Sequence, residues 1–115
     1  SDNNSAVLVE ILNGTNSGVV VEVHVAQQAA GHQPYEELQE IAEKLTGELK
    51  EAYGDKVEVK YINADNTGLA DYPLVSRVLQ MGYPYPITLI NGEPKFAGGI
   101  MGPDIKGSID EILNQ

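Results

Sequence analysis

The feature that most constrains the fold of this chain is the alternation of two hydrophobic periods along it. Val19–Val25 carries valine at every second position and is β-branched, which is typical of a strand. Over Tyr35–Tyr53, apolar residues instead recur at spacings of three and four, which predicts an amphipathic helix of about five turns. The two patterns go on alternating to the end of the chain. Such an order predicts an α/β fold.

The later elements follow from the same patterns and from turn residues. They are, in order, strand Lys56–Ile62 near a sheet edge, helix Leu69–Met81, strands Pro86–Ile90 and Lys95–Ala97, and helix Pro103–Leu113. Asn63–Gly68 is predicted to be a loop, and Asn91-Gly92 a hairpin turn. Because crossovers are right-handed, the first two core strands are expected to be parallel, and the hairpin adds an antiparallel edge.

One apolar segment does not fit into this core. Ala6–Leu12 is apolar apart from Glu10, so it is predicted to form an extra N-terminal strand. We expect it either at the free edge beside Lys56–Ile62 or paired with a second copy of the chain. Residues 1–5 are expected to be a flexible segment and residues 6–115 a single domain.

The charge of the chain restricts its partners. Seventeen acidic and seven basic residues give a formal net charge of −10, which repels nucleic acid and anionic membrane surfaces. No apolar run approaches the ~20 residues that a membrane-spanning helix needs. We therefore expect a protein or an extended peptide as partner, including a second copy in a homodimer, with no nucleic acid and no membrane insertion. A cytoplasmic location is favoured, and an exported or tethered form is the open alternative if residues precede Ser1.

The chain contains no cysteine, which excludes disulfides, thiolate nucleophiles and thiolate metal sites. His24 and His32 are candidate metal ligands, but no carboxylates are placed beside them in a ligand pattern. No serine or cysteine nucleophile is spaced with His32 either. We therefore expect no metal, no cofactor and no catalytic residue. The sequence leaves enzymatic activity open and favours a protein that is not an enzyme.

The segment Pro86–Gly92, followed by Phe96–Gly99 and then Asp104, resembles the glutaredoxin-type region of the thioredoxin superfamily. In that region a cis proline precedes a strand, a turn and a double glycine. The resemblance extends over nearly everything after Gly18. It implies a thioredoxin-like, three-layer α/β/α fold with a mixed sheet and a βαβαββα core. Tyr61-Ile62 and Tyr83–Pro86 are also similar to a group of small bacterial thioredoxin-fold proteins, a likeness that implies no activity.

In this superfamily, the loop before the first core helix presents a Cys-x-x-Cys motif. The counterparts of the two cysteines here are Ala29 and His32, or Ala30 and Gln33, depending on a one-residue shift in the alignment. Neither pair can exchange disulfides. Two explanations remain open, namely a natural loss of redox function and an engineered replacement of cysteine.

The resemblance also implies a binding groove. A cis bond before Pro86 would leave the Tyr85 backbone free to pair with an extended peptide, whereas the alternative is that Pro86 only shapes a turn and Tyr85 packs in the core. In glutaredoxins the glycines and the acid hold glutathione, but here Ile100–Pro103 separates Gly99 from Asp104, and basic residues are missing near the loop. We do not expect glutathione binding. The expected groove residues are Ala29, Ala30, His32, Gln33, Tyr85, Pro86, Gly98 and Gly99.

The sequence therefore predicts a redox-inactive thioredoxin-like domain that binds a protein or peptide, or regulates one. Two alternatives remain open. The chain could be a relative of thiol-disulfide oxidoreductases whose cysteines are lost or mutated, or it could be a structural domain for homo-oligomerisation through Ala6–Leu12.

Overall fold

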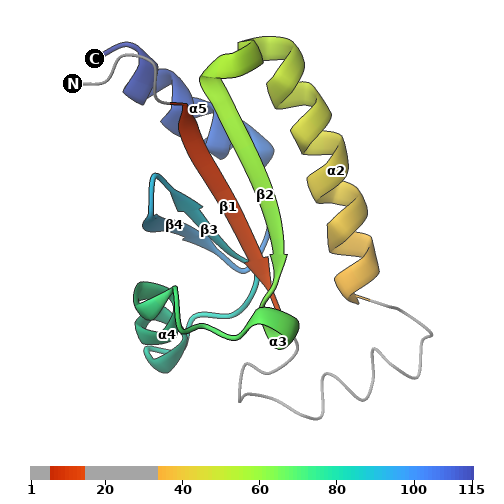
Figure 1. The fold of residues 1–115 in the computed structure, drawn as a ribbon, viewed down its shortest axis with the longest axis vertical. Coiled ribbons are helices and arrows are strands. Elements are labelled where there is room, and N and C mark those ends of the chain that lie inside the picture. The colour runs from red at the N-terminus through yellow and green to blue at the C-terminus, as the bar shows by residue number, and fades with distance from the viewer. Residues whose placement is uncertain (1–5, 15–33) are drawn as a thin grey trace.

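The computed structural model describes residues 6–14 and 34–115, which form a four-stranded mixed β-sheet with helices packed against it (Figure 1). The strand order is β2-β1-β3-β4. The elements are β1 Val7–Asn13, α2 Pro34–Tyr53, the 3₁₀-helix η1 Gly54–Lys56, β2 Val57–Asn63, α3 Ala64–Thr67, α4 Pro73–Gln80, β3 Ile87–Ile90, β4 Glu93–Ala97 and α5 Gly102–Leu113.

Strand β1 lies beside the strand predicted at Lys56–Ile62, as one of the two expectations had it, but it lies inside the sheet, which corrects the prediction of an edge or intermolecular position for Ala6–Leu12. β1 pairs in parallel with β2, with Val7 opposite Val57, and antiparallel with β3, with Val9 opposite Ile90. A strand that is covered on both faces is apolar almost throughout, as this one is. The segment Val19–Val25, which the sequence suggested as the first core strand, lies outside the described residues.

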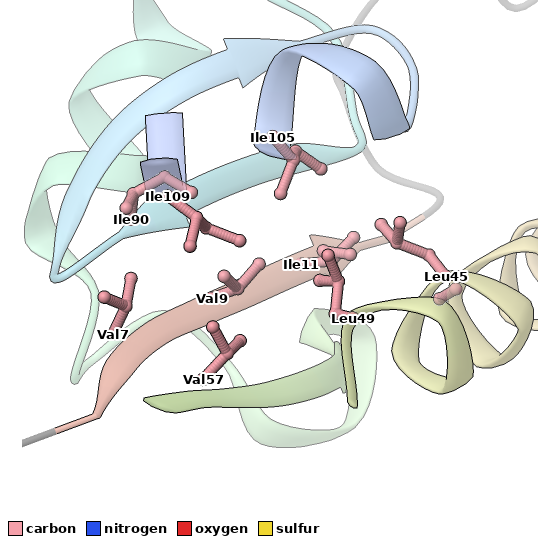
Figure 2. Close-up of a cluster of buried hydrophobic side chains, with 10 residues drawn as sticks. Val7, Val9, Ile11, Leu45, Leu49, Val57, Ile90, Ile105 and Ile109 are labelled. Carbon is pink, nitrogen blue, oxygen red and sulfur yellow. The ribbon is translucent and has the colours of Figure 1, made fainter. Parts of the chain in front are cut away.

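One hydrophobic cluster fills the space between the sheet and helices α2 and α5 (Figure 2). Alternate residues of β1 point into it, which is the period-two geometry of a strand. Each fully buried aliphatic side chain contributes about 1.5–3 kcal/mol of transfer free energy. The buried members are Val7, Val9, Ile11, Ala42, Leu45, Leu49, Val57, Ile90, Ile105 and Ile109.

A second, smaller cluster lies on the opposite face of the sheet, against α3 and α4. Its buried members are Leu12, Ala64, Val75, Ile87 and Leu89. Tyr85 and Tyr72 pack against this cluster and are half-buried. Glu10 occupies the same face of β1 as Leu12 and is only 8% exposed.

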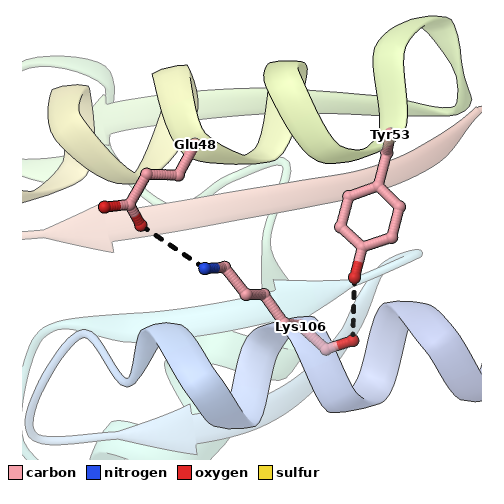
Figure 3. Close-up of polar contacts among 3 residues, drawn as sticks. All are labelled: Glu48, Tyr53 and Lys106. Atoms are coloured by element: carbon pink, nitrogen blue, oxygen red, sulfur yellow. Dashed lines mark hydrogen bonds and ion pairs between the residues drawn. The ribbon is translucent and has the colours of Figure 1, made fainter.

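Polar contacts join α2 to α5 on the outer side of the first cluster (Figure 3). The Tyr53 hydroxyl donates to Oδ1 of Asp110 at 2.7 Å and lies 3.4 Å from the carbonyl oxygen of Lys106. The Lys106 ammonium lies 3.6 Å from Oε1 of Glu48. The hydrogen bond to Asp110, and then burial, raise the pKa of Tyr53. Both side chains of the ion pair are exposed, so this pair contributes only ~0–1 kcal/mol.

The hairpin turn and the start of α3 show how the local sequence determines the backbone conformation. Asn91 and Gly92 both have positive φ, at 51° and 87°, as a type I′ hairpin requires. The Asn91 side-chain oxygen accepts the Leu8 N–H at 2.8 Å, and the Asn91 backbone N–H donates to the Leu8 carbonyl at 2.8 Å. The segment after β2 is a short helix, α3, and the prediction of a loop there was wrong. Asn63 stabilises this helix because its side chain accepts the Asp65 N–H at 3.0 Å.

Among the helices in the described part of the chain, none is both long enough and apolar enough to cross a membrane.

Candidate functional site

The candidate site lies at the end of the sheet where β1 and β2 finish beside α3 (Figure 1). The antiparallel ladder between β1 and β3 ends with Leu12 opposite Ile87. Tyr85 and Pro86 enter β3 just beyond the last paired residue, next to the chain leaving β1. The Tyr85–Pro86 peptide bond is cis, as the resemblance implied. The fold therefore gathers the Tyr85–Pro86 segment and the ends of two parallel strands in one place.

The ring of Tyr85 packs directly against the backbone at Gly14. A Cβ atom placed on Gly14 would lie 2.9 Å from Cε2 of Tyr85 and 3.1 Å from its Cζ, which is too close for a real side chain. The same point lies 3.1 Å from Oδ1 of Asp65. Burial, and then the negative charge of Asp65, raise the pKa of the Tyr85 phenol. Tyr85, Asp65 and the end of β1 thus converge on one spot, and only glycine at position 14 leaves room for them.

Two further polar side chains come from the ends of the parallel strands. Asn13, the last residue of β1, is 4% exposed, and its Nδ2 donates to the Tyr61 hydroxyl of β2 at 3.3 Å. Polar residues at the carboxyl ends of neighbouring parallel strands meet at one edge of a sheet, which is where open α/β sheets commonly bind ligands. This edge therefore has the usual location of a binding site in such sheets.

Of the predicted groove residues, the structure brings Pro86 and Gly98 together. The Gly98 N–H donates to the Pro86 carbonyl at 2.9 Å. Gly98 has a φ of 93°, which favours glycine, and a Cβ there would lie 3.4 Å from Cγ of Pro84. A Cβ on Gly99 would meet no atom within 4 Å. Ala29, Ala30, His32 and Gln33 lie outside the described residues.

An open groove of about 270 Å³ lies between α4 and β4. Its lining is apolar or aromatic except for Lys95, whose ammonium lies 3.4 Å from a carboxylate oxygen of Glu93. The groove adjoins the predicted binding edge, because its lining residues Ile87 and Ala97 directly follow Pro86 and directly precede Gly98. The remaining lining residues are Val78, Tyr83, Pro94 and Phe96.

One side chain that lines the groove, Tyr83, is 53% exposed, and Met81, two residues earlier in the chain, is 66% exposed. Large apolar side chains exposed next to a concave surface mark interaction sites more often than isolated ones do. The groove and the Tyr85 segment share one hydrophobic cluster, since Val78, Ile87, Ala97 and Tyr85 all belong to it or pack against it.

This region presents backbone groups, aromatic rings, the Asp65 carboxylate and an apolar groove. Within the ranges that the structure describes, no three histidine, aspartate or glutamate side chains converge to hold a metal ion. The two histidines, His24 and His32, are outside those ranges.

Gly14, Asn13 and Asp65 are residues of this site that the sequence analysis did not identify. Asn13 ends β1 and Gly14 follows it, and Asp65 lies two residues beyond the end of β2, the parallel neighbour of β1. The sequence carries this signal, but the more regular alternation of Val19–Val25 predicts that segment, rather than Val7–Asn13, as the first core strand.

No protein-family model and no curated protein matches this chain. Its function is therefore inferred from the residues at this end of the sheet.

Proposed function

We propose that this chain is a redox-inactive thioredoxin-like domain that binds an extended peptide segment of a partner protein. The peptide would lie along the edge formed by Tyr85, Pro86, Gly98 and Gly99. The observation that carries the proposal is the strand order β2-β1-β3-β4, with β1 parallel to β2 and antiparallel to β3. This order supports a thioredoxin-like assignment in which β1 is the first core strand and no additional N-terminal strand is needed.

The backbone at Tyr85 supports peptide binding. Among the described residues, the N–H and C=O of Tyr85 make no backbone hydrogen bond, because the ladder with β1 stops at Ile87. An extended segment that aligns with Tyr85 would pair with these two groups, as in other cases where a peptide adds to a sheet. The apolar groove beside Ile87 and Ala97 would take side chains of the same peptide.

The alternatives are less well supported. Thiol-disulfide exchange requires a thiolate, and the chain has no cysteine. Homo-oligomerisation through Ala6–Leu12 was suggested by its expected position at an edge. In the structure β1 has a neighbour on both sides, so that reason no longer applies.

The proposal is tested by selection from a random peptide library on the immobilised protein, followed by fluorescence anisotropy with a selected peptide. Gly99→Val adds bulk at the binding edge where nothing inside the fold obstructs it. Gly47→Val is the matched control, because Gly47 is exposed on α2 and also has open space around its Cβ position. We expect Gly99→Val to weaken binding about tenfold, a change of about 1.4 kcal/mol, and Gly47→Val to leave it unchanged.

Failure to enrich any peptide over a blank surface would argue against the proposed function. Equal binding of the selected peptide by Gly99→Val and the unmodified protein would place the binding site elsewhere. Thermal unfolding of both variants checks that the difference in binding comes from the edge and not from a change in stability.

A further inference from the structure

Strand β2 is an edge strand with a regular backbone. In the described sheet it pairs with β1 alone, and its register with β1 runs from Val57 to Asn63 without a shift. The edge at the other end of the sheet is different, because β4 contains Pro94 and its register with β3 shifts between Thr88 and Leu89. Proline and bulges are devices that keep an edge from pairing with another strand. Of the two edges of the described sheet, β2 is therefore the one that can accept a further strand.

The side chains of β2 alternate between the two faces of the sheet. Val57 belongs to the cluster under α2 and α5, and Val59, which is only partly buried, packs against that cluster. Glu58 and Lys60 lie on the opposite face, and both are exposed. The edge thus combines a half-buried valine on one face with two opposite charges, two positions apart, on the other.

Both of these charged side chains are available to a partner. Neither Glu58 nor Lys60 takes part in an ion pair within the part of the chain that the structure describes. Lys60 lies beside Glu10 in the register of β1 and β2, but the Glu10 carboxylate accepts a hydrogen bond from the Tyr72 hydroxyl. A strand that pairs with β2 would therefore meet a carboxylate and an ammonium group that are both exposed.

The order of the two charges fits a second copy of the same strand. In an antiparallel pair with a twofold axis at Val59, Glu58 of each copy lies opposite Lys60 of the other. An axis at Glu58 or at Lys60 would instead place two like charges opposite each other. Unlike charges directly across a ladder stabilise it, and like charges destabilise it. The charges therefore select the register in which the two copies of Val59 face each other and bury their remaining apolar surface.

The net charge of the chain acts only weakly at this edge. The elements η1 and β2 together carry Asp55, Lys56, Glu58 and Lys60, so this strip is neutral although the whole chain has a net charge of −10. At physiological ionic strength, exposed charges more than ~8 Å apart are largely screened from each other. The nearby charges of the strip therefore decide which register is favoured.

We infer that two copies of this chain associate through β2 in this antiparallel register. The two sheets then form one continuous sheet in which the β2 strands are neighbours. The interface is isologous, because each copy contributes the same residues. The inference goes beyond the proposed function and does not depend on it, since the surface is β2 and not the edge at Tyr85.

The test exchanges the two charges in the full chain. Glu58→Lys and Lys60→Glu each give β2 two charges of one sign, so that like charges face each other in a pair of identical copies. Sedimentation equilibrium from about 1 to 500 µM protein measures the self-association. We expect the unmodified chain to dimerise within this range and each single variant to dimerise about tenfold more weakly. An equimolar mixture of the two variants brings unlike charges together again, so it should dimerise about as strongly as the unmodified chain.

Two controls separate the register from the net charge. The double variant Glu58→Lys/Lys60→Glu keeps the net charge and restores the complementarity, so we expect it to dimerise like the unmodified chain. Glu111→Lys changes the net charge as Glu58→Lys does, but at an exposed position of α5, so dimerisation should change by less than about twofold. Thermal unfolding checks that every variant is folded.

Three results would overturn the inference. The chain could remain monomeric over the whole range, as it would if β2 were covered within one chain. Dimerisation that neither single variant weakens would place the contact elsewhere. Variants that fail to associate when mixed would rule out the register. Peptide binding is measured separately, so each of these results leaves the proposed function intact.

Discussion

The Tyr72 hydroxyl donates a hydrogen bond of 2.9 Å to a carboxylate oxygen of Glu10. This bond links the residue before α4 to the middle of the central strand, where Glu10 is only 8% exposed. Burial of the phenol, and then its bond to the Glu10 carboxylate, raise the pKa of Tyr72 to about 12. A buried carboxylate with a neutral donor is thereby stabilised on the α4 face of the sheet, and the stability of the fold acquires a dependence on pH.

Tyr72→Phe tests this dependence. The pKa of Tyr72 in the folded state, about 12, lies above its ordinary value of 10.0, so its contribution to stability is complete below pH 10 and is lost as the pH rises through 12. Allowing for partial exposure, we expect the unmodified protein to lose about 1–2 kcal/mol of unfolding free energy over that range, relative to Tyr72→Phe. Urea unfolding of both proteins at several pH values measures the difference. Parallel stability curves would contradict the assignment.

Gly14→Ala tests the contact between β1 and Tyr85. The added methyl group would lie 2.9 Å from Cε2 of Tyr85, and relieving this clash is expected to destabilise the fold by about 1–3 kcal/mol. In a Tyr85→Ala background the same substitution should have a much smaller effect. Gly47→Ala is the control, because it meets open space in a helix and is expected to stabilise by about 0.5–1 kcal/mol. An equal effect of Gly14→Ala with and without the Tyr85 ring would disprove the contact.

Thr88→Val is expected to stabilise the protein. Thr88 is fully buried in β3, and its hydroxyl oxygen has no hydrogen-bond partner among the described residues. Replacing the hydroxyl with a methyl group of similar shape removes the penalty for burying an unpaired polar group, which is about 1 kcal/mol or more. Thr88→Ser keeps the hydroxyl and loses the methyl group, so it should destabilise. A loss of thermal stability in Thr88→Val would indicate that the hydroxyl is paired in solution.

Two substitutions compare how much two contacts between α2 and α5 contribute to the free energy of unfolding. Tyr53→Phe removes the 2.7 Å hydrogen bond to Asp110, and we expect it to lower the unfolding free energy by about 0.5–1.5 kcal/mol. Glu48→Gln removes only the exposed ion pair with Lys106, and we expect a change below about 0.5 kcal/mol. Chemical denaturation of both variants gives the comparison. The reverse order would show that the ion pair, rather than the tyrosine, joins the helices.

Local patterns predicted most of the elements correctly. The spacing of apolar residues located α2, α4 and α5, because a helix that packs on a sheet must bury one stripe. The dipeptide Asn91-Gly92 located the hairpin, because both residues tolerate positive φ. Among the described strands, β2 lies at the edge of the sheet, as predicted.

The position of β1 could not be derived from the same patterns. Val19–Val25 has the more regular alternation, but alternation indicates a strand with one polar face, whereas an interior strand is apolar on both faces. Val7–Asn13 fits the second description, with Glu10 as the exception that Tyr72 compensates for. The partner of that carboxylate lies 62 positions away in the chain, so no local rule could identify it.

The same limit applies to the candidate site. Tyr85 and Pro86 were predicted from a local resemblance, whereas Gly14 and Asp65 are recognised only when three segments are brought together. The role of Gly14 depends on the ring of Tyr85, and that contact follows from the sheet register rather than from the residues around position 14.

The interior position of β1 also has a consequence for how the protein is synthesised. Leu8 contacts Asn91, 83 positions later, so β1 obtains its second neighbour only after the whole segment between these two residues has been translated. Contacts of such long range slow folding and leave nascent chains open to association. We expect release of the nascent chain before β3 to yield fragments in which one side of β1 is unpaired, so that late translational arrest produces aggregates rather than a partly active domain.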